Sequence, residues 1–512
     1  MSRNFASSMV QLSPSSGLDV HAYLVLKQKP TRQEQKLKTL HKYLQKYSSG
    51  WKKHLEMADL LYETGQWSEA IAEYYLVIKE QPQVIKPYLK LGKILQLSNR
   101  KNEAVLVYTE ALNLAKREAT KQHLTGLIES CHGNIRAAII AFKSATSLEP
   151  KNIVHWMALG QLQMEAEHLV VALATFKTIL DLDPDNFMGL IYSYDLLLAL
   201  GNLTEAAKCL QHIVDIAPQD SQTLKRLITY RCRKKLVLGE EGKQTKKLIN
   251  SWRKQASGIP EVNNLLARFY ILRGEQDKGI KISKQFVAEN SHNPHAWYYY
   301  SRCLSDIGKY ETAADAIIKA YQLSLNRYCG NCDREIYRTL CEILPVAGRL
   351  EQARDMIAEM LTVFPESWSL WATAGRVLAE HFSENNCAAD YSLYSTKIQP
   401  QLADTWLCHG KVLFLLGKYK AAVKSLTQSW QLLPKAKNFQ SVSTAFWLGE
   451  SYQALKQNQS CRAWFEMSYQ NTAELIEFDP VLAQSWREKA LARLNKCQEC
   501  QGKNMHLNSK NS

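Results

Sequence analysis

The sequence predicts an all-α protein, an α-solenoid in which pairs of helices stack side by side. Two periodic features carry this prediction. Small residues that can pack between two helices return every 34 residues, as Ala70, Ala104, Ala138, Ala172 and Ala206. Prolines, which lack an N–H and end a helix, recur in the same register as Pro82, Pro150, Pro184 and Pro218. A period of this length is typical of repeat proteins whose units bury their apolar faces only against their neighbours.

One unit shows the fullest version of the repeated motif. Its residues are Trp156, Leu159, Gly160, Ala172, Phe176 and Pro184. This pattern of Trp-x2-Leu-Gly, Ala-x3-Phe and Pro resembles the tetratricopeptide repeat, a unit of two helices. The resemblance implies a right-handed superhelix whose concave groove binds proteins, and it leaves the partner unnamed.

The period holds without a slip through a first array of five repeats, residues 51–220. The turn inside each repeat falls at Gly65, Asn99, Gly133, Glu167 and Gly201. Before this array, residues 21–50 predict a basic first helix. Residues 1–20 are rich in serine and predict a disordered tail, with a transit peptide as the alternative.

The register fails after Asp220, and residues 221–259 are expected to form a basic junction or a degenerate repeat. The period then resumes in a second array of about six repeats, residues 260–475. Residues 476–496 carry apolar side chains at helical spacing along one face, which predicts a capping helix. Residues 497–512 are expected to form a disordered tail. The predicted solenoid thus holds about eleven helix pairs in two arrays.

The composition indicates a protein of a reducing compartment. No run of about 18 uncharged apolar residues occurs, so no transmembrane helix is expected. Four cysteines fall in predicted repeat helices, where a cysteine acts as a small apolar side chain; they are Cys303, Cys341, Cys408 and Cys461. We therefore expect a cytoplasmic protein without a disulfide framework, and peripheral association with a membrane stays open.

Neither a cofactor nor a catalytic site is expected. The sequence has no Gly-rich phosphate loop, no G-x-S-x-G elbow and no H-E-x-x-H motif. Two pairs of cysteines, Cys329 with Cys332 and Cys497 with Cys500, have the spacing of metal ligands. A structural zinc site needs four ligands, and several repeats separate the two pairs. Free thiols are therefore the expectation, and metal binding by either pair stays open.

The net charge of +15 is concentrated in two segments. Residues 21–54 carry nine Lys and Arg against one Glu, and residues 221–258 carry eleven against two. Such segments attract an acidic protein segment, nucleic acid or an anionic membrane surface, and a merely solvated face is the alternative. The candidate residues in the junction are Arg231, Arg233, Lys234, Lys235, Lys246 and Lys247.

The first helix of each repeat is expected to line the concave groove. In the second array the groove positions are mostly basic, and neighbouring positions add aromatic side chains. The candidate groove residues are Arg268, His295, Tyr298, Arg302, Arg338, Arg376, Lys411 and Phe414. Arginine binds carboxylates through two parallel hydrogen bonds, so an acidic peptide segment is a candidate ligand. Alternatively, these charges pair with one another between adjacent first helices.

The sequence therefore predicts a non-catalytic scaffold or adaptor, which binds protein partners in its groove and serves the assembly of complexes. Two alternatives stay open. One is a scaffold for nucleic acid or an anionic membrane surface, acting through residues 21–54 and 221–258. The other is a regulatory subunit of an enzyme complex.

Overall fold

A computed structural model of the chain describes residues 32–46, 50–63, 66–98, 100–255, 260–325, 330–382, 385–433 and 439–508. Every secondary-structure element in these residues is an α-helix. Among the described residues, α2 (Arg32–Lys46) precedes the repeats. The predicted disordered tail, residues 1–20, lies outside the described residues, as does much of the basic first helix expected at 21–50.

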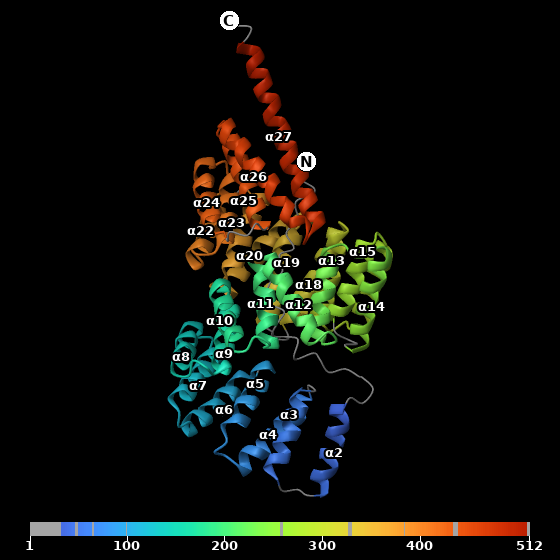
Figure 1. Ribbon diagram of the computed structural model, residues 1–512, viewed down its shortest axis with the longest axis vertical. Coiled ribbons are helices and arrows are strands. Elements are labelled where there is room, and N and C mark those ends of the chain that lie inside the picture. Colours follow the sequence, from blue (N-terminus) through green and yellow to red (C-terminus); the bar gives the residue numbers. More distant parts are fainter. Residues whose placement is uncertain are drawn as a thin grey trace.

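Five helix pairs follow α2 (Figure 1). They are α3 (Trp51–Glu63) with α4 (Trp67–Glu80), α5 (Ile85–Leu97) with α6 (Lys101–Leu114), α7 (Glu118–Cys131) with α8 (Ile135–Leu148), α9 (Ile153–Glu165) with α10 (Leu169–Leu182), and α11 (Phe187–Ala199) with α12 (Leu203–Ile216).

The segment in which the sequence register fails forms α13 (Ser221–Arg233) and α14 (Gly239–Gln255). Five residues separate these two helices, whereas three separate α11 from α12. The longer turn, together with an α14 of 17 residues where α12 has 14, explains why the 34-residue register is lost here although a helix pair is present. Leu224 and Ile228 of α13 share an apolar cluster with Trp252 of α14 and Phe269 of the next helix, so the stack continues through this segment.

Six further pairs and one more helix follow in the described residues up to 508. The pairs are α15 (Pro260–Leu272) with α16 (Gln276–Glu289), α17 (Pro294–Asp306) with α18 (Tyr310–Leu325), α19 (Gly330–Val346) with α20 (Leu350–Val363), α21 (Trp368–His381) with α22 (Asn385–Ile398), α23 (Ala403–Leu415) with α24 (Tyr419–Leu432), and α25 (Phe439–Ala454) with α26 (Asn458–Ile476). The last helix, α27 (Pro480–Asn508), continues beyond residue 496 into the segment expected to be a tail. The predicted fold class, an all-α solenoid of stacked helix pairs, is confirmed.

The recurring residues of the motif hold each pair together. The small residue of the second helix is fully buried, as at Ala172, and lets the two helices approach closely. A glycine of the first helix faces an aromatic ring of the second: a Cβ added at Gly160 would lie 2.7 Å from the ring of Phe176. The indole Nε1 of Trp156 donates a hydrogen bond of 2.8 Å to the carbonyl of Pro150, six residues earlier. The same bond recurs at Trp371 with Pro365 and at Trp406 with Pro400, which ties each repeat to the end of the one before.

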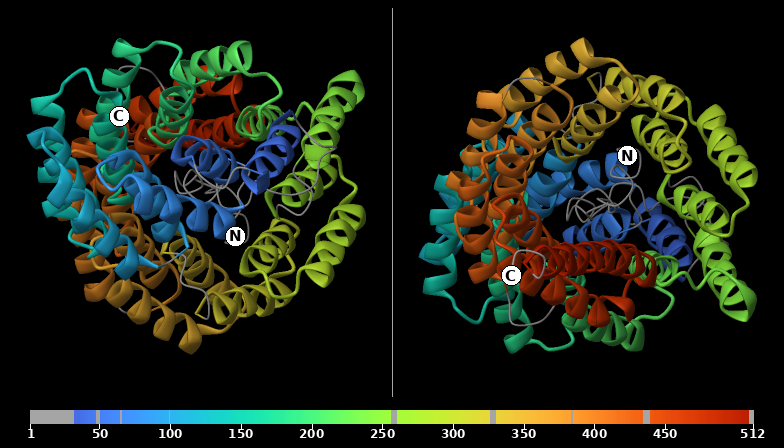
Figure 2. Two further views of the ribbon diagram at one scale, coloured as in Figure 1. Left: turned by 90° about the horizontal axis from the view of Figure 1, so that it is seen from below. Right: turned by 90° about the horizontal axis from the view of Figure 1, so that it is seen from above.

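The stack winds around a central axis, and its second turn lies against the later helices of the first array (Figure 2). Contacts between residues about 200 positions apart show where one turn of the superhelix meets the next. Trp368 and Ala372 of α21 belong to the same apolar cluster as Phe176 of α10. Leu203 of α12 packs against the cluster formed by α25, α26 and α27. We call this boundary between the two turns the seam.

None of the described helices combines the length and apolar content that a bilayer crossing requires. The eight cysteines that are described form no disulfide with one another. No three His, Cys, Asp or Glu side chains within the described ranges come together in a way that would hold a metal ion. The two Cys-x-x-Cys pairs fall on residues whose side chains lie outside this description.

Candidate binding groove

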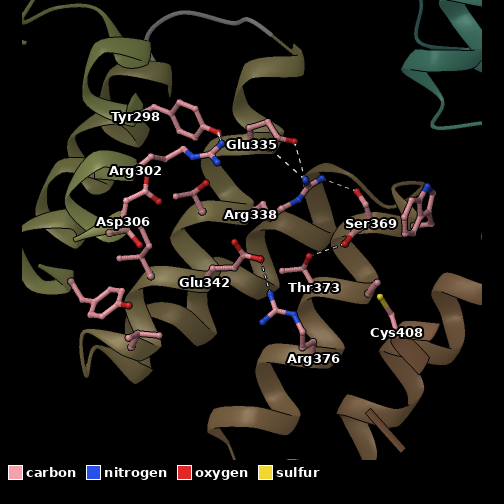
Figure 3. A pocket seen from close by; sticks show the side chains of 17 residues that line it. Tyr298, Arg302, Asp306, Glu335, Arg338, Glu342, Ser369, Thr373, Arg376 and Cys408 are labelled. Carbon is pink, nitrogen blue, oxygen red and sulfur yellow. Dashed lines mark hydrogen bonds and ion pairs between the residues drawn. The ribbon is translucent and has the colours of Figure 1, made fainter. Parts of the chain in front are cut away.

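A pocket opens between the first helices of the second array (Figure 3), and we call it the groove pocket. Most of its wall comes from α17, α19 and α21, the first helices of three successive repeats, and Cys408 of α23 closes one side. Stacking places equivalent faces of these helices next to one another. Side chains about one repeat apart in the sequence therefore meet in one site.

Arg302 and Arg338 project into the groove pocket from α17 and α19, and both are already bonded within the protein (Figure 3). Arg302 Nη1 donates a hydrogen bond of 3.0 Å to the hydroxyl of Tyr298. Arg338 Nη2 donates one of 3.0 Å to Ser369 Oγ on α21, and Nη1 lies 3.2 Å from the carboxylate of Glu335. These bonds fix both guanidinium groups before any partner arrives.

Arg376 of α21 bridges two repeats. Its Nη2 donates a hydrogen bond of 2.6 Å to Glu342, which lies 34 residues earlier on α19. Its Nη1 donates one of 2.9 Å to Glu380, one helical turn further on. This is a charge pairing between adjacent first helices, as the alternative interpretation of the groove expects.

Charges in the groove pocket are balanced. Three arginines line it, and so do three carboxylates, those of Asp306, Glu335 and Glu342. Burial by itself would lower the pKa of Arg338 and Arg376, but the neighbouring carboxylates outweigh burial and raise both above the ordinary value. Burial raises the pKa of the Tyr298 hydroxyl. The groove pocket thus offers fixed donors and acceptors side by side.

One end of the groove pocket meets the turn between α9 and α10. Glu167 in this turn is buried, and its backbone is left-handed with φ +57°. Its carboxylate accepts hydrogen bonds from Ser367 Oγ at 2.9 Å and Ser369 Oγ at 2.7 Å, at the start of α21. Arg334 Nη1 donates a further bond of 2.9 Å. The first array therefore supplies an acidic group to the rim of the groove pocket.

The predicted groove residues divide into two sets. Tyr298, Arg302, Arg338 and Arg376 line the groove pocket, and the other four candidates do not. Arg268 lies 3.7 Å from Asp306. His295 is the second residue of α17, and its backbone N–H donates to Asn293 Oδ1 at 3.0 Å. The ring of Phe414 packs against Trp447, with ring centres 5.2 Å apart.

Lys411 is buried in α23, and its Nζ lies 5.8 Å from the ring centre of Trp447. Burial lowers the pKa of Lys411 to about 8. Asp404, two turns earlier on the same helix, is also buried, and burial raises its pKa to about 6. The two groups form no ion pair in the described part of the chain. Asp404 Oδ2 accepts a hydrogen bond of 3.4 Å from Gln440 Nε2.

Several residues of the site do not stand out in the sequence. The three acidic residues of the groove pocket are ordinary members of amphipathic helices. Only for Glu335 does the local sequence predict a contact, because it stands three residues before Arg338 on one helix face. Glu167 also stands out in the sequence, because it occupies a turn position that holds glycine in the neighbouring repeats. These glycines, Gly133 and Gly201, adopt positive φ. The partners of Glu167 near residue 367 cannot be inferred from that position.

The six candidates of the basic junction point in different directions. Arg231 pairs with Glu241, and Arg233 lines a cavity at the seam. Lys234 lies over the ring of Tyr230, at 5.1 Å from its centre, and Lys246 over that of Tyr270, at 5.8 Å. The side chains with the greatest exposure among the six are Lys235, Lys246 and Lys247.

Comparisons with known proteins identify the repeats. A family model described as tetratricopeptide repeat matches residues 157–221, and a second model with the same description matches residues 85–118. The chain therefore contains tetratricopeptide repeats in these two stretches. No curated protein matches its sequence.

Two solved structures share the solenoid architecture at low identity. Yeast Tom70 matches with 12% identity and a TM-score of 0.43, over 90% of this chain and 97% of Tom70. The APC/C hetero-tetramer Cut9-Hcn1 matches with 14% identity and a TM-score of 0.36, again over 90% of this chain and 97% of the matched one. Both TM-scores are below 0.5, so neither match says anything about the partners of this chain.

Proposed function

We propose that the protein is a non-catalytic scaffold that binds a protein partner in the groove pocket of the second array. The single observation that carries this proposal is the convergence of Arg302, Arg338 and Arg376, from three successive first helices, on one open site. Tetratricopeptide repeats typically mediate contacts between proteins. An extended segment laid across three helices would meet one arginine per repeat.

The balance of charge narrows the class of partner. Every arginine of the groove pocket already has a partner, and acceptors line the pocket as densely as donors. A wholly acidic peptide would have to compete with Glu335 and Glu342 for their arginines. A segment that carries both acidic and donor groups fits this site better, because it can pair with the arginines and the carboxylates together.

A matched pair of substitutions tests the proposal. Thr339 lines the groove pocket, so Thr339→Arg fills the pocket with a long charged side chain. Thr362 is an exposed threonine on α20 of the same array, so Thr362→Arg adds the same charge elsewhere. Affinity capture from the native cell should lose its reproducible protein partners with the first variant and keep them with the second. If both variants capture the same proteins as the wild type, the groove pocket is not the binding site.

A second candidate function rests on α14. Five cations lie exposed along this helix, and its C-terminal two thirds carry no acidic residue; they are Lys243, Lys246, Lys247, Arg253 and Lys254. Such a surface would attract nucleic acid or anionic lipid, with an affinity that falls steeply with salt. Binding of generic RNA or anionic vesicles that persists at physiological salt, and is lost on Lys246→Glu with Lys247→Glu, would favour this candidate over the scaffold.

A further inference from the structure

A second cavity lies at the seam, and we call it the seam cavity. One wall comes from α11, α12 and α13, and the facing wall comes from α25, α26 and the segment that begins α27. Most of its lining is apolar, with Leu198 and Leu203 on one side and Phe439, Phe478 and Leu482 on the other. The walls are about 240 residues apart in the sequence and meet because the second turn of the superhelix lies against α11, α12 and α13 (Figure 1).

Arg233 places a guanidinium group in this apolar surrounding. Within the part of the chain that the structure describes, its side chain makes no hydrogen bond and no ion pair, in contrast to the arginines of the groove pocket. Burial lowers the pKa of Arg233. A partly buried cation of this kind costs free energy unless an anion compensates it.

The acid nearest in the lining, Asp479, does not compensate Arg233 by direct contact. Asp479 Oδ1 accepts a hydrogen bond of 3.0 Å from the backbone N–H of Leu482, which caps the start of α27. Burial is the largest influence on Asp479 and raises its pKa, while the backbone N–H groups of Leu482 and Val481 and the charge of Arg233 act in the opposite sense. Arg233 is therefore attracted by the negative charge of Asp479 without forming an ion pair with it, and its N–H donors stay available for direct contact with an anion.

Two further polar groups of the lining have no partner in the described residues. The hydroxyl of Tyr194 makes no hydrogen bond there, although the side chain is buried. Gln440 Oε1 is buried and unpaired. A hydroxyl and a guanidinium are donors that suit a carboxylate, and an amide oxygen accepts from an N–H group.

We propose that the seam cavity binds a carboxylate carried on an apolar group, with Arg233 as the residue that holds the carboxylate. The apolar lining accommodates the body of the ligand, and Arg233 and Tyr194 supply the donors. A small apolar site with a few polar groups that fix orientation is the usual form of a ligand pocket. The proposal does not depend on the proposed function, because none of these residues lines the groove pocket.

Two matched pairs of probes test the ligand chemistry on the full chain by isothermal titration. Octanoate is compared with octan-1-ol, and N-acetyl-leucine is compared with N-acetyl-leucinamide. We expect each carboxylate to bind at least about tenfold more tightly than its neutral analogue, because hydrogen bonds to a charged partner are the stronger ones. Binding of octanoate alone indicates a free acid as the ligand, and binding of N-acetyl-leucine alone indicates the end of a peptide chain.

Variants locate the site. Arg233→Gln should weaken the binding of octanoate or N-acetyl-leucine about tenfold or more. Arg253→Gln, at an exposed arginine of α14, should leave their binding unchanged. If Arg233→Gln fails to fold, Tyr194→Phe takes its place and should weaken binding several-fold. Thr339→Arg should have no effect, which separates this site from the groove pocket. The proposal is overturned if neither carboxylate binds at millimolar concentration, if neutral analogues bind as well, or if the Arg233 and Tyr194 variants bind like the wild type.

Discussion

Glu167 and Ser369 are joined by a hydrogen bond of 2.7 Å although 202 residues separate them in the chain. The backbone of Glu167 is left-handed, and a side chain other than glycine in that conformation costs about 1 kcal/mol. Gly133 and Gly201 occupy the corresponding turns of the neighbouring repeats. The cost at Glu167 is offset by bonds that fix one turn of the superhelix on the next.

A double-mutant cycle measures how strongly this contact holds the seam. We expect Glu167→Gln and Arg334→Gln each to increase hydrogen exchange at the α9–α10 turn. The double variant should lose less protection free energy than the two single variants lose together. The coupling free energy should be about 1–3 kcal/mol, because the pair is buried and each single variant strands a charge or a donor. Exchange at α3, three repeats before α9 in the chain, serves as the control. Additive effects would show that the two side chains act independently.

Acidification should loosen the same contact. Burial alone would raise the pKa of Glu167, but Arg334 and Arg338 outweigh burial and lower it. A carboxyl group with a lowered pKa stabilises the folded state fully above its ordinary pKa of 4.5, and this contribution is lost as the pH falls through the folded value. Backbone amides at the seam should be better protected from hydrogen exchange in the wild type than in Glu167→Gln. This difference should therefore shrink below about pH 4.5. A difference that stays constant down to pH 3 would contradict this account.

Local features of the chain were predictable from the sequence. The spacing of Ala70, Ala104 and the later small residues predicts the helix pairs, because the residues that pack two helices together are neighbours within one repeat. Even the paired Trp156 and Pro150 lie six residues apart. The break after Asp220 marks a longer turn between α13 and α14 and a longer second helix in this pair.

Contacts across the seam were not predictable in this way. The pitch of a solenoid is the sum of small rotations between successive repeats, and a slight error in each one moves the second turn away from the first. Nothing in the sequence therefore places Glu167 beside Ser369, or turns Arg233 inward to face α27. Half of the candidate groove residues also lie outside the groove pocket, because Arg268 belongs to the repeat before it and Lys411 and Phe414 to the repeat after it, while His295 stands at the start of α17.

Gly160 should tolerate no side chain. A Cβ at this position would lie 2.7 Å from the ring of Phe176, so Gly160→Ala should destabilise the fourth repeat by about 1–3 kcal/mol through overpacking. Hydrogen exchange of α9 and α10 measures the effect locally. Combining Gly160→Ala with Phe176→Leu removes the ring and should recover part of the loss, and no recovery would mean that the clash is not the cause.

Asp404 should reduce stability at neutral pH. Burial raises its pKa from 3.8 to about 6, so its protonated form stabilises the fold at low pH and this contribution is lost as the pH rises through about 6. We expect Asp404→Asn to stabilise α23 by about 1–3 kcal/mol at pH 7, with the gain disappearing near pH 4. Asp390→Asn, at an exposed position on α22, should change nothing. A loss of stability at pH 7 in the Asp404 variant would show that its charge is compensated.

Lys411 should behave in the opposite sense. Burial lowers its pKa from 10.5 to about 8, so the charged form is disfavoured in the folded state and stability rises as the pH increases from about 8 towards 10.5. Lys411→Met keeps an unbranched side chain that is one atom shorter, and it removes the charge. We expect this variant to be at least as stable as the wild type at pH 7, by thermal unfolding. A marked loss would indicate an anionic partner for Lys411.

Photo-crosslinking tests the scaffold function most directly. A benzophenone-bearing phenylalanine analogue replaces either Val346, which lines the groove pocket, or Val363, an exposed valine at the end of α20. After irradiation in the native cell, crosslinked chains are identified by mass spectrometry. The groove account predicts a reproducible protein crosslink from position 346 that Thr339→Arg abolishes, and none of the same identity from position 363. Equal crosslinks from both positions, or no protein crosslink from position 346, would contradict it.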